Sequence, residues 1–221
     1  MKSRTSFVIR TKNEEKWIGH AIQSVIDFSG DDTEIIIVDN ESDDDTLEVV
    51  NLFPKRFYNI KVFSISRKDY TPGRSLNLGI EKTSKDSNIV GILSAHCRII
   101  NLDKKLIEDK IFNEGHFAVF GKQVPIFRGK RAAFRYVWSN FNTDTAVVNP
   151  LENLDFKRYF FHNAFSFIKK DTWRNEKFDE DLSGKEDRYW AEKNVLKGEK
   201  YLFEPTLICE HYWTSKGATW R

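Results

Sequence analysis

The chain has 221 residues and a formal net charge of +2, since 35 basic side chains nearly match 33 acidic ones. This balance excludes proteins that depend on a broad basic surface, so no nucleic-acid partner is expected. No apolar run reaches the roughly 20 residues that span a bilayer, and no secretory leader opens the sequence, which indicates a cytoplasmic protein. The length and the 40% of hydrophobic residues fit one α/β domain.

Strand and helix patterns alternate through the first part of the chain. We predict strands over 6–10, 34–39, 59–64 and 89–93, separated by helices over 14–28, 44–52 and 74–82. Asn13 is expected to cap the first helix. The segment EIIIVD shows no polar alternation, which is typical of a parallel strand covered on both faces. The order predicts a mostly parallel central sheet with helices on both faces.

The pattern loosens after about residue 100. Further helices are predicted over 102–112 and 186–197, and further strands over 117–120, 164–168, 201–203 and 207–209. Gly198 is expected to end the last helix.

Polar side chains follow the predicted strands of the first half. Their ends read Arg10-Thr11-Lys12, Asp39-Asn40-Glu41, Ser66-Arg67-Lys68 and Ser94-Ala95-His96. Ligands of parallel α/β sheets bind at the carboxyl ends of the strands. Adjacent cations at the first and third of these ends favour an anionic ligand.

Four segments together carry a resemblance to a known family. SFVIRTKNE (6–14) and IIVDNESDDDT (36–46) resemble the opening of the family 2 glycosyltransferases of the GT-A fold. YTPGRSLNLG (70–79) is similar to the family's Gly-Arg…Asn-x-Gly segment, and Glu186-Asp187 is similar to its late acidic motif. The motifs occur in the family's order across nearly the whole chain. GKQVP (121–125) also resembles the bacterial rhamnosyltransferase-like branch.

The resemblance implies an inverting glycosyltransferase with one GT-A domain over 1–221. About 1–100 would bind a UDP-, dTDP- or GDP-sugar, and about 101–221 would hold the acceptor and the catalytic residue. The acceptor would be a carbohydrate or a lipid-linked glycan, and the setting would be bacterial surface polysaccharide synthesis.

Donor-binding candidates lie at the first two strand ends. Asp39 can accept a hydrogen bond from a uracil or thymine N3–H or from a ribose hydroxyl, and Asp43 is a candidate for the same nucleoside. Thr11 and Glu14 are expected to contact the base or ribose. Ordinary turn or helix-entry chemistry is an open alternative for Asp39, Asp43 and Glu14.

The helix after Pro72-Gly73 supplies a second group of donor-binding candidates. Arg74 lies on its first turn, where a cation and free backbone N–H groups suit a diphosphate. The alternative is a surface arginine. Asn77 lies three residues later on the same helix face and is expected to support the same site, and Ser94 is included with these residues.

The fourth strand end departs from the family pattern. Ser94-Ala95-His96-Cys97 stands where Asp-x-Asp normally binds a metal. Three interpretations stay open. His96 is a metal ligand, or the enzyme works with little or no metal while cations balance the leaving diphosphate, or the chain is a non-catalytic binding module.

His211 joins this question because related enzymes often place a histidine near the donor phosphates. A His96–His211 pair suits Mn²⁺ better than the hard Mg²⁺ ion. The alternative is that His211 packs in an aromatic cluster with Tyr212 and Trp213.

Asp187 is the predicted catalytic residue. Inverting transfer needs a carboxylate that takes the acceptor hydroxyl's proton, and the neighbouring Glu186 raises the pKa of one of the two carboxyl groups. The alternative is that both residues only complement a helix dipole.

Two further interpretations remain. The basic-aromatic stretch 127–138 is a candidate for contact with a lipid-linked acceptor or the inner face of the membrane, although a solvated amphipathic helix is an alternative. A nucleotidyltransferase would need a glycine-rich, lysine-bearing loop after the first strand, and residues 10–14 lack one.

Overall fold

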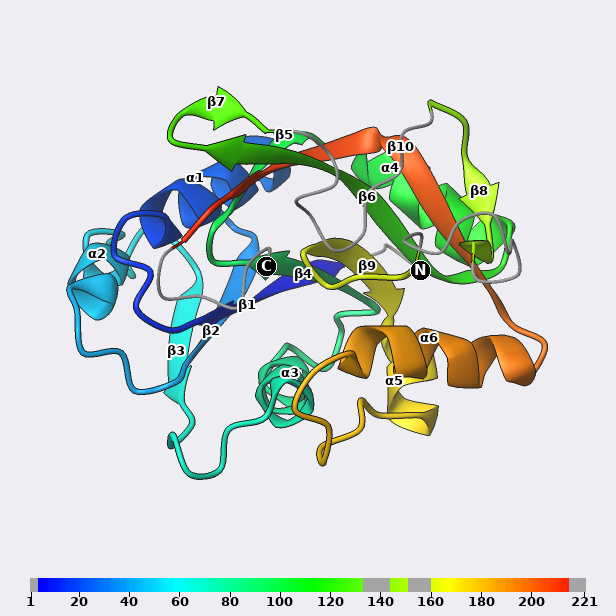
Figure 1. Ribbon diagram of the computed structural model, residues 1–221, viewed down its shortest axis with the longest axis horizontal. Coiled ribbons are helices and arrows are strands. Elements are labelled where there is room, and N and C mark those ends of the chain that lie inside the picture. Colours follow the sequence, from blue (N-terminus) through cyan, green and yellow to red (C-terminus); the bar gives the residue numbers. More distant parts are fainter. Residues whose placement is uncertain (1–3, 133–143, 151–159, 215–221) are drawn as a thin grey trace.

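The computed structural model describes residues 4–132, 144–150 and 160–214. The predicted alternation of strand and helix is confirmed through β4 (Figure 1). The elements of this first part are β1 (Thr5–Thr11), α1 (Ile18–Ser29), β2 (Glu34–Asp39), α2 (Thr46–Asn51), β3 (Ile60–Ser64), α3 (Pro72–Glu81) and β4 (Ile89–Ser94).

The second part is less regular, as the sequence indicates. Its elements are β5 (Cys97–Asn101), α4 (Lys104–Glu108), a π-helical turn (Asp109–Asn113), β6 (His116–Phe127), β7 (Lys130–Arg131), β8 (Val147–Val148), β9 (Phe165–Lys169), α5 (Lys170–Asn175), α6 (Glu186–Leu196) and β10 (Lys200–Tyr212). Half of the basic-aromatic stretch, residues 133–138, lies outside the described residues.

The described strands form one sheet in the order β3-β2-β1-β4-β9-β6-β10-β5, to which the short β7 and β8 add at β6 and β10. β1 pairs in parallel with β2 and β4, and β2 pairs in parallel with β3. β9 enters antiparallel between β4 and β6, while β6 and β10 are parallel to each other. The α/β fold class with a mostly parallel sheet is therefore confirmed.

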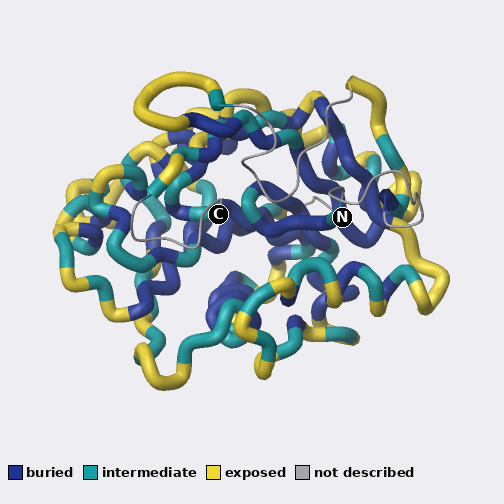
Figure 2. Tube along the Cα trace, viewed as in Figure 1, coloured by how far each residue is buried: buried dark blue, intermediate teal, exposed yellow. Residues whose placement is uncertain are grey.

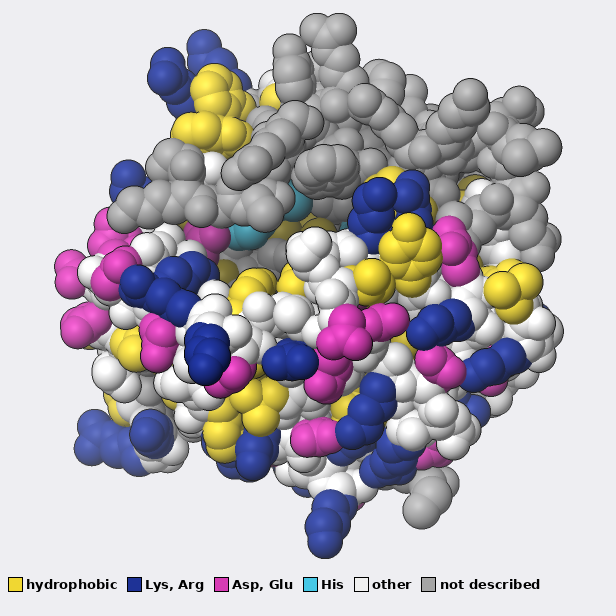
Figure 3. All heavy atoms as spheres, turned by 60° about the horizontal axis from the view of Figure 1, so that its bottom comes forward, with side chains coloured by type: hydrophobic (Ala, Val, Ile, Leu, Met, Phe, Trp, Pro, Cys, Tyr) yellow, Lys and Arg dark blue, Asp and Glu magenta, His cyan; other side chains and the backbone are white. Residues whose placement is uncertain are grey.

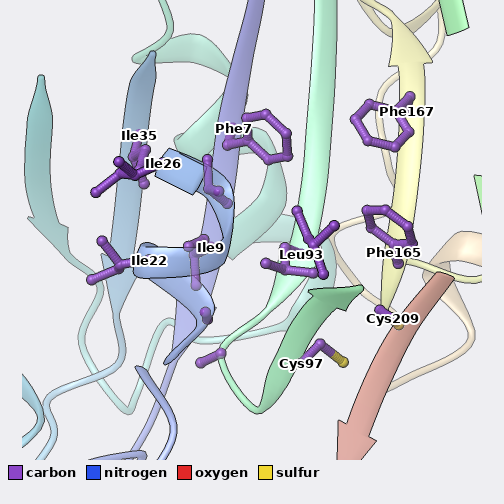
Figure 4. Close-up of a cluster of buried hydrophobic side chains, with 14 of the residues drawn as sticks. Phe7, Ile9, Ile22, Ile26, Ile35, Leu93, Cys97, Phe165, Phe167 and Cys209 are labelled. Carbon is purple, nitrogen blue, oxygen red and sulfur yellow. The ribbon is translucent and has the colours of Figure 1, made fainter. Parts of the chain in front are cut away.

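Alternating side chains of β1 supply both faces of the sheet. Phe7 and Ile9 pack into one buried cluster with Ile22 of α1 (Figure 4), whereas Val8 packs into another cluster with Leu76 of α3. Figure 2 shows that the central strands are largely buried, whereas β7 and β8 lie at the surface. Each fully buried aliphatic side chain stabilises the fold by about 1.5–3 kcal/mol, so these clusters fix the sheet beneath the strand-end loops.

Two predicted helices differ from the structure. α1 begins at Ile18 rather than at residue 14, because Asn13 has a positive φ of 53° and the N–H groups of Trp17 and Ile18 both donate to Glu14 O. Asn13 is therefore not the helix cap. The helix predicted over 102–112 is instead α4 followed by the π-helical turn.

The two predicted closing strands are one strand, β10, with an irregularity. Its pairing with β6 shifts between Glu204, opposite Gly121, and Ile208, opposite Lys122. Pro205 lies inside this shift, where its missing N–H costs no ladder hydrogen bond. Among the described helices, none is long and apolar enough to cross a membrane.

Candidate active site

The loops that follow β1 and β2 are bound to each other. Lys12 Nζ donates to the carbonyl oxygens of Asn40 and Glu41 at 2.8 and 2.5 Å. Asn13 Nδ2 donates to Asp43 Oδ1 at 2.6 Å. Asn13 and Glu41 have positive φ angles of 53° and 48°. Such conformations cost energy in non-glycine residues and persist only where the surroundings enforce them, so these loops are held in a fixed arrangement.

Asp39 and Thr11 lie side by side, because they are paired in the β1–β2 register. Asp39 is buried and accepts hydrogen bonds from Ser42 N at 3.0 Å and Ser42 Oγ at 2.6 Å. Thr11 Oγ1 and Asn40 Oδ1 are buried without a hydrogen-bond partner among the described residues. A buried unsatisfied polar group costs about 1–3 kcal/mol, so this strand end has unused capacity for a polar ligand.

Asp43 is exposed and links the loops after β1, β2 and β3. Its pKa is lowered by the hydrogen bond from Asn13 and then by that from Arg67, whose Nη2 lies 2.9 Å from Asp43 Oδ2. α2 begins only at Thr46, so Asp43 is not a helix cap. Its predicted contact with the nucleoside stays a prediction.

His96 and His211 come together, as predicted for a pair. His96 lies in the turn between β4 and β5, and His211 lies near the end of β10. Their rings stack with centroids 4.9 Å apart and planes at 26°. Burial, and then the charge of His96, lowers the pKa of His211 well below its usual value, which keeps this imidazole neutral near pH 7.

Both imidazoles are oriented by oxygen acceptors. Glu14 Oε1 lies 2.8 Å from His96 Nδ1, and Gln123 Oε1 lies 2.5 Å from His211 Nδ1. An acceptor at Nδ1 places the proton there and leaves the lone pair on Nε2, which is the usual second shell of metal-binding histidines. Glu14, which was predicted to contact the base or ribose, is thus hydrogen-bonded to His96.

The described residues fit a metal only in part. Within the described ranges, no group of three or more His, Cys, Asp or Glu side chains is arranged to hold an ion. Two imidazoles suit a first-row metal such as Mn²⁺ rather than Mg²⁺. The remaining ligands would have to come from a bound molecule.

The amide of Asn77 is used within the fold, and its predicted support of the donor site stays a prediction. Asn77 is buried, and its Nδ2 donates to Phe178 O and Glu180 Oε1, both at 2.9 Å. Its Oδ1 accepts from Trp173 Nε1 at 2.9 Å and Phe178 N at 3.2 Å. Both amide donors and both acceptor positions are used, so Asn77 holds the segment before α6 against α3.

The first turn of α3 is covered by the same segment. A Cβ at Gly73 would lie 2.0 Å from Asp179 O, so only glycine allows this close approach. The guanidinium of Arg74 lies 3.7 Å from Glu180 and 3.8 Å from Asp181. Acidic side chains therefore already face the cation that was predicted to meet a diphosphate. A role of Arg74 toward a donor stays a prediction.

Asp187 lies on the first turn of α6. Its Oδ1 accepts from Arg188 N at 2.8 Å, and its Oδ2 accepts from Asn163 N at 3.1 Å. Burial, and then the charge of Glu186, raises the pKa of Asp187 to about 7. A carboxyl group with this pKa can exchange a proton near neutral pH.

Arg10 brings the start of α6 to the strand ends. Its Nη1 lies 3.3 Å from Glu186 Oε1, and the residue itself pairs in register with Ser94 of β4. Ser94 N in turn donates to Ala164 O at 3.0 Å, next to the Asn163 N–H that binds Asp187. Sequence reasoning noted Arg10 as a strand-end cation but missed its pairing with Glu186.

One surface hollow lies apart from these groups. A hollow of about 460 Å³ between α1 and α2 is lined by residues that include Lys16, Val49 and Phe53, and none of the predicted site residues lines it. Figure 3 shows acidic and basic side chains intermingled over one face, with histidine atoms near its middle. This mixture agrees with the small net charge.

A family model described as glycosyl transferase family 2 matches residues 6–175. The chain belongs to this family. This confirms the resemblance that the motifs carry. The strand-end groups are therefore candidates for nucleotide-sugar transfer.

Two curated bacterial relatives are similar to the chain. One is the GalNAc(5)-diNAcBac-PP-undecaprenol beta-1,3-glucosyltransferase of Campylobacter jejuni, 26% identical over 199 residues, which are 90% of this chain and 61% of the relative. The other is the O-antigen chain rhamnosyltransferase RfbN of Salmonella typhimurium, 24% identical over 189 residues, which are 80% and 56% of the two chains. The chain therefore spans less than two thirds of these relatives.

Two solved structures share the fold. Staphylococcus aureus TarS in complex with UDP-GlcNAc superimposes with a TM-score of 0.72 at 18% identity, covering 97% of this chain and 60% of TarS. A mannosyltransferase from Pyrobaculum calidifontis, with GDP-Man and Mn²⁺, gives 0.68 at 18% identity and covers 98% and 59%. These likenesses show the GT-A fold.

Proposed function

We propose that the chain transfers a sugar from a nucleoside-diphosphate sugar to a hydroxyl group of a glycan acceptor, with inversion at the anomeric carbon. The observation that carries this proposal is Asp187, a carboxyl group with a pKa of about 7 beside the strand ends. Family membership supplies the reaction class, and the position of Asp187 supplies the base.

The proposed displacement needs one proton transfer and one bond exchange. Asp187 takes the proton of the acceptor hydroxyl as its oxygen forms a bond to the anomeric carbon. The bond from that carbon to the diphosphate oxygen breaks, and the nucleoside diphosphate leaves with the electron pair. A positioned base contributes about 10²- to 10⁴-fold to such a step.

The whole described chain acts as one domain in this proposal, with a division near residue 100. The first part offers Thr11, Asp39 and Asp43 to the nucleoside and Ser94 to the sugar-phosphate side. The second part contributes Asp187 from α6 and His211 from β10. Support comes from the ion pair between Arg10 and Glu186, which joins the two parts at the strand ends.

His96 and His211 are the residues proposed to hold a divalent metal. A bound metal would supply positive charge for the leaving diphosphate. Glu14 and Gln123 hold the two imidazoles in place through their Nδ1 atoms. The mannosyltransferase structure that contains Mn²⁺ has the same fold as this chain, and this likeness of fold supports the assignment.

The acceptor proposed is a lipid-linked glycan of a bacterial surface polysaccharide. Both curated relatives support this, since one is a glucosyltransferase of an undecaprenol-linked oligosaccharide and the other a rhamnosyltransferase of an O-antigen chain. Contact with the inner face of the membrane belongs to the same proposal. The described part of the basic-aromatic stretch adds the exposed Phe127, with the Arg128 guanidinium 5.2 Å from its ring centre.

The first experiment compares wild type with Asp187→Asn. Binding of UDP, dTDP, GDP and CMP, each with Mn²⁺, Mg²⁺ or chelator, identifies the nucleotide by thermal shift. Release of the matching nucleoside diphosphate then measures turnover of its sugar donors. We expect the variant to keep its nucleotide affinity and to lose at least about 100-fold in turnover.

Other results would point elsewhere. Turnover retained by Asp187→Asn would refute Asp187 as the base. Pyrophosphate release would indicate a nucleotidyltransferase. Nucleotide binding by the wild type without release from any donor and acceptor pair would indicate a non-catalytic binding module.

A further inference from the structure

The Arg10 side chain contacts two helices, α3 and α6. It lies near the end of β1, and its Nη1 donates to Pro72 O of α3 at 3.1 Å and to Glu186 Oε1 of α6 at 3.3 Å. The Arg10 side chain is 21% exposed and that of Glu186 is 6% exposed. Breaking such a shielded pair leaves an uncompensated charge and has a large effect. The arginine is therefore a fixed part of the site and not a surface cation.

The two carboxylates at the start of α6 have different partners. Glu186 faces a guanidinium, whereas Asp187 accepts from the neutral backbone N–H groups of Asn163 and Arg188. Adjacent shielded carboxylates resist being ionised together, so they titrate as a coupled pair. The Glu186 carboxylate is already engaged by the cation. Its neighbour is then the one that exchanges a proton near neutral pH.

We propose that Arg10 is a positioning residue that engages the Glu186 carboxylate in an ion pair, and that this contact leaves Asp187 as the carboxylate that accepts the acceptor's proton. The inference rests on the proposed function, because it assigns how the base of that reaction is selected. It adds a residue that the motifs did not mark.

Other groups around the pair agree with this arrangement. Burial alone would lower the pKa of Arg10, but the charge of Glu186, then Tyr70 and then Asp187, raises it. Arg10 in turn lowers the pKa of Asp187, against the larger effects of burial and of Glu186. The Arg188 guanidinium lies 4.2 Å from the ring centre of Phe160. Loss of Arg10 should therefore raise the pKa of Asp187.

Glu186 follows a residue with a left-handed backbone. Lys185, which precedes it, has a φ of 65° and lies in the left-handed region. This conformation is unfavourable for a residue with a side chain and needs support from the surroundings. The ion pair between Arg10 and Glu186 is one such support.

The test is the pH dependence of kcat/KM for wild type, Arg10→Lys, Arg10→Gln, Glu186→Gln and the double variant Arg10→Gln/Glu186→Gln. We expect the acid limb of the wild type near pH 7. Arg10→Gln should move this limb up by about one pH unit or more, which is about a fivefold loss at pH 7 that approaches tenfold at lower pH and recovers by about pH 9. Glu186→Gln should move the limb down, and the double variant should return it toward the wild-type position. Arg10→Lys keeps a cation and should shift it least.

A second measurement does not need activity. The carboxyl ¹³C signal of Asp187 in protein labelled at aspartate should titrate at higher pH in Arg10→Gln than in wild type. Thermal unfolding and nucleotide affinity show whether each variant is folded. If Arg10→Gln does not fold, Glu186→Gln and Arg10→Lys decide the matter through the same two readouts.

The outcomes separate this inference from the proposed function. An equal loss of kcat/KM at every pH, or an unchanged titration of Asp187 in the folded variants, overturns the role of Arg10. Retained turnover in Asp187→Asn instead overturns the assignment of the base, whatever Arg10 does.

Discussion

The two ends of the parallel strands shift the pKa of a buried carboxyl group in opposite directions. At the start of β2, Glu34 accepts from Ser6 Oγ at 2.6 Å, from Ser84 N and Oγ at 2.7 and 2.8 Å, and from Lys61 Nζ at 2.7 Å. Burial alone would raise its pKa, but these donors lower the pKa to about 2. At the opposite edge, Asp187 has only backbone donors and a like-charged neighbour, and its pKa is about 7.

The difference shows where the fold is built for stability and where it is built for chemistry. Glu34 is fully satisfied, so its charge stabilises the folded state. Asp187 is held at a cost, because its charged form is disfavoured by its surroundings. Thr11, near the same edge, has a buried hydroxyl without a partner among the described residues. Thr11 and Asp187 therefore leave polar capacity at the strand ends where ligands of such sheets bind.

The largest expected effect is on stability at the Glu34 edge. Glu34→Gln should lower the free energy of unfolding by about 4 kcal/mol at pH 7, because it leaves Lys61 and two hydroxyls with a poorer acceptor. Since the folded pKa is depressed, this contribution is fully present above the unfolded value of about 4.5 and is lost as pH falls toward 2. Urea unfolding at several pH values measures it, with the exposed Glu81→Gln as a control expected near zero.

The close approach at the first turn of α3 gives the next largest effect. Gly73→Ala should cost about 3 kcal/mol, because the new Cβ would meet the backbone oxygen of Asp179. Gly184→Ala is the matched control, since its Cβ would meet nothing within 4 Å. Equal stability of the two variants in urea would show that α3 and the segment before α6 are not in contact.

Asp187→Asn should raise the free energy of unfolding at neutral and higher pH. A raised carboxyl pKa means that the folded state binds the proton more tightly, so wild-type stability falls as pH rises from about 4 to 7. The asparagine variant lacks this loss and should be more stable than wild type by on the order of 2 kcal/mol at pH 8, with little difference at pH 4. A constant difference across this range would contradict the raised pKa.

The smallest expected effect separates ligand binding from folding. Thr11→Val removes the buried hydroxyl but keeps the shape of the side chain, so stability should stay the same or rise slightly. Nucleotide affinity should fall about fivefold if the hydroxyl binds the donor.

Asn77→Ala should show the opposite pattern. Its stability should fall by about 2 kcal/mol at nearly unchanged nucleotide affinity, because the Asn77 amide is used within the fold. Isothermal titration and urea unfolding of both variants check this.

The sequence by itself determined the parallel strands, their order along the chain and the polar loops at their carboxyl ends. Apolar runs such as that of β2 and strand-end motifs are local patterns, so they can be interpreted without coordinates. Only the tertiary structure decided which polar residues are used internally. Arg10 and Glu186 lie 176 positions apart, and Asn77 and Phe178 lie 101 apart. Contacts at such separations depend on how helices pack on the sheet, and these contacts set both the role of Asn77 and the pKa of Asp187.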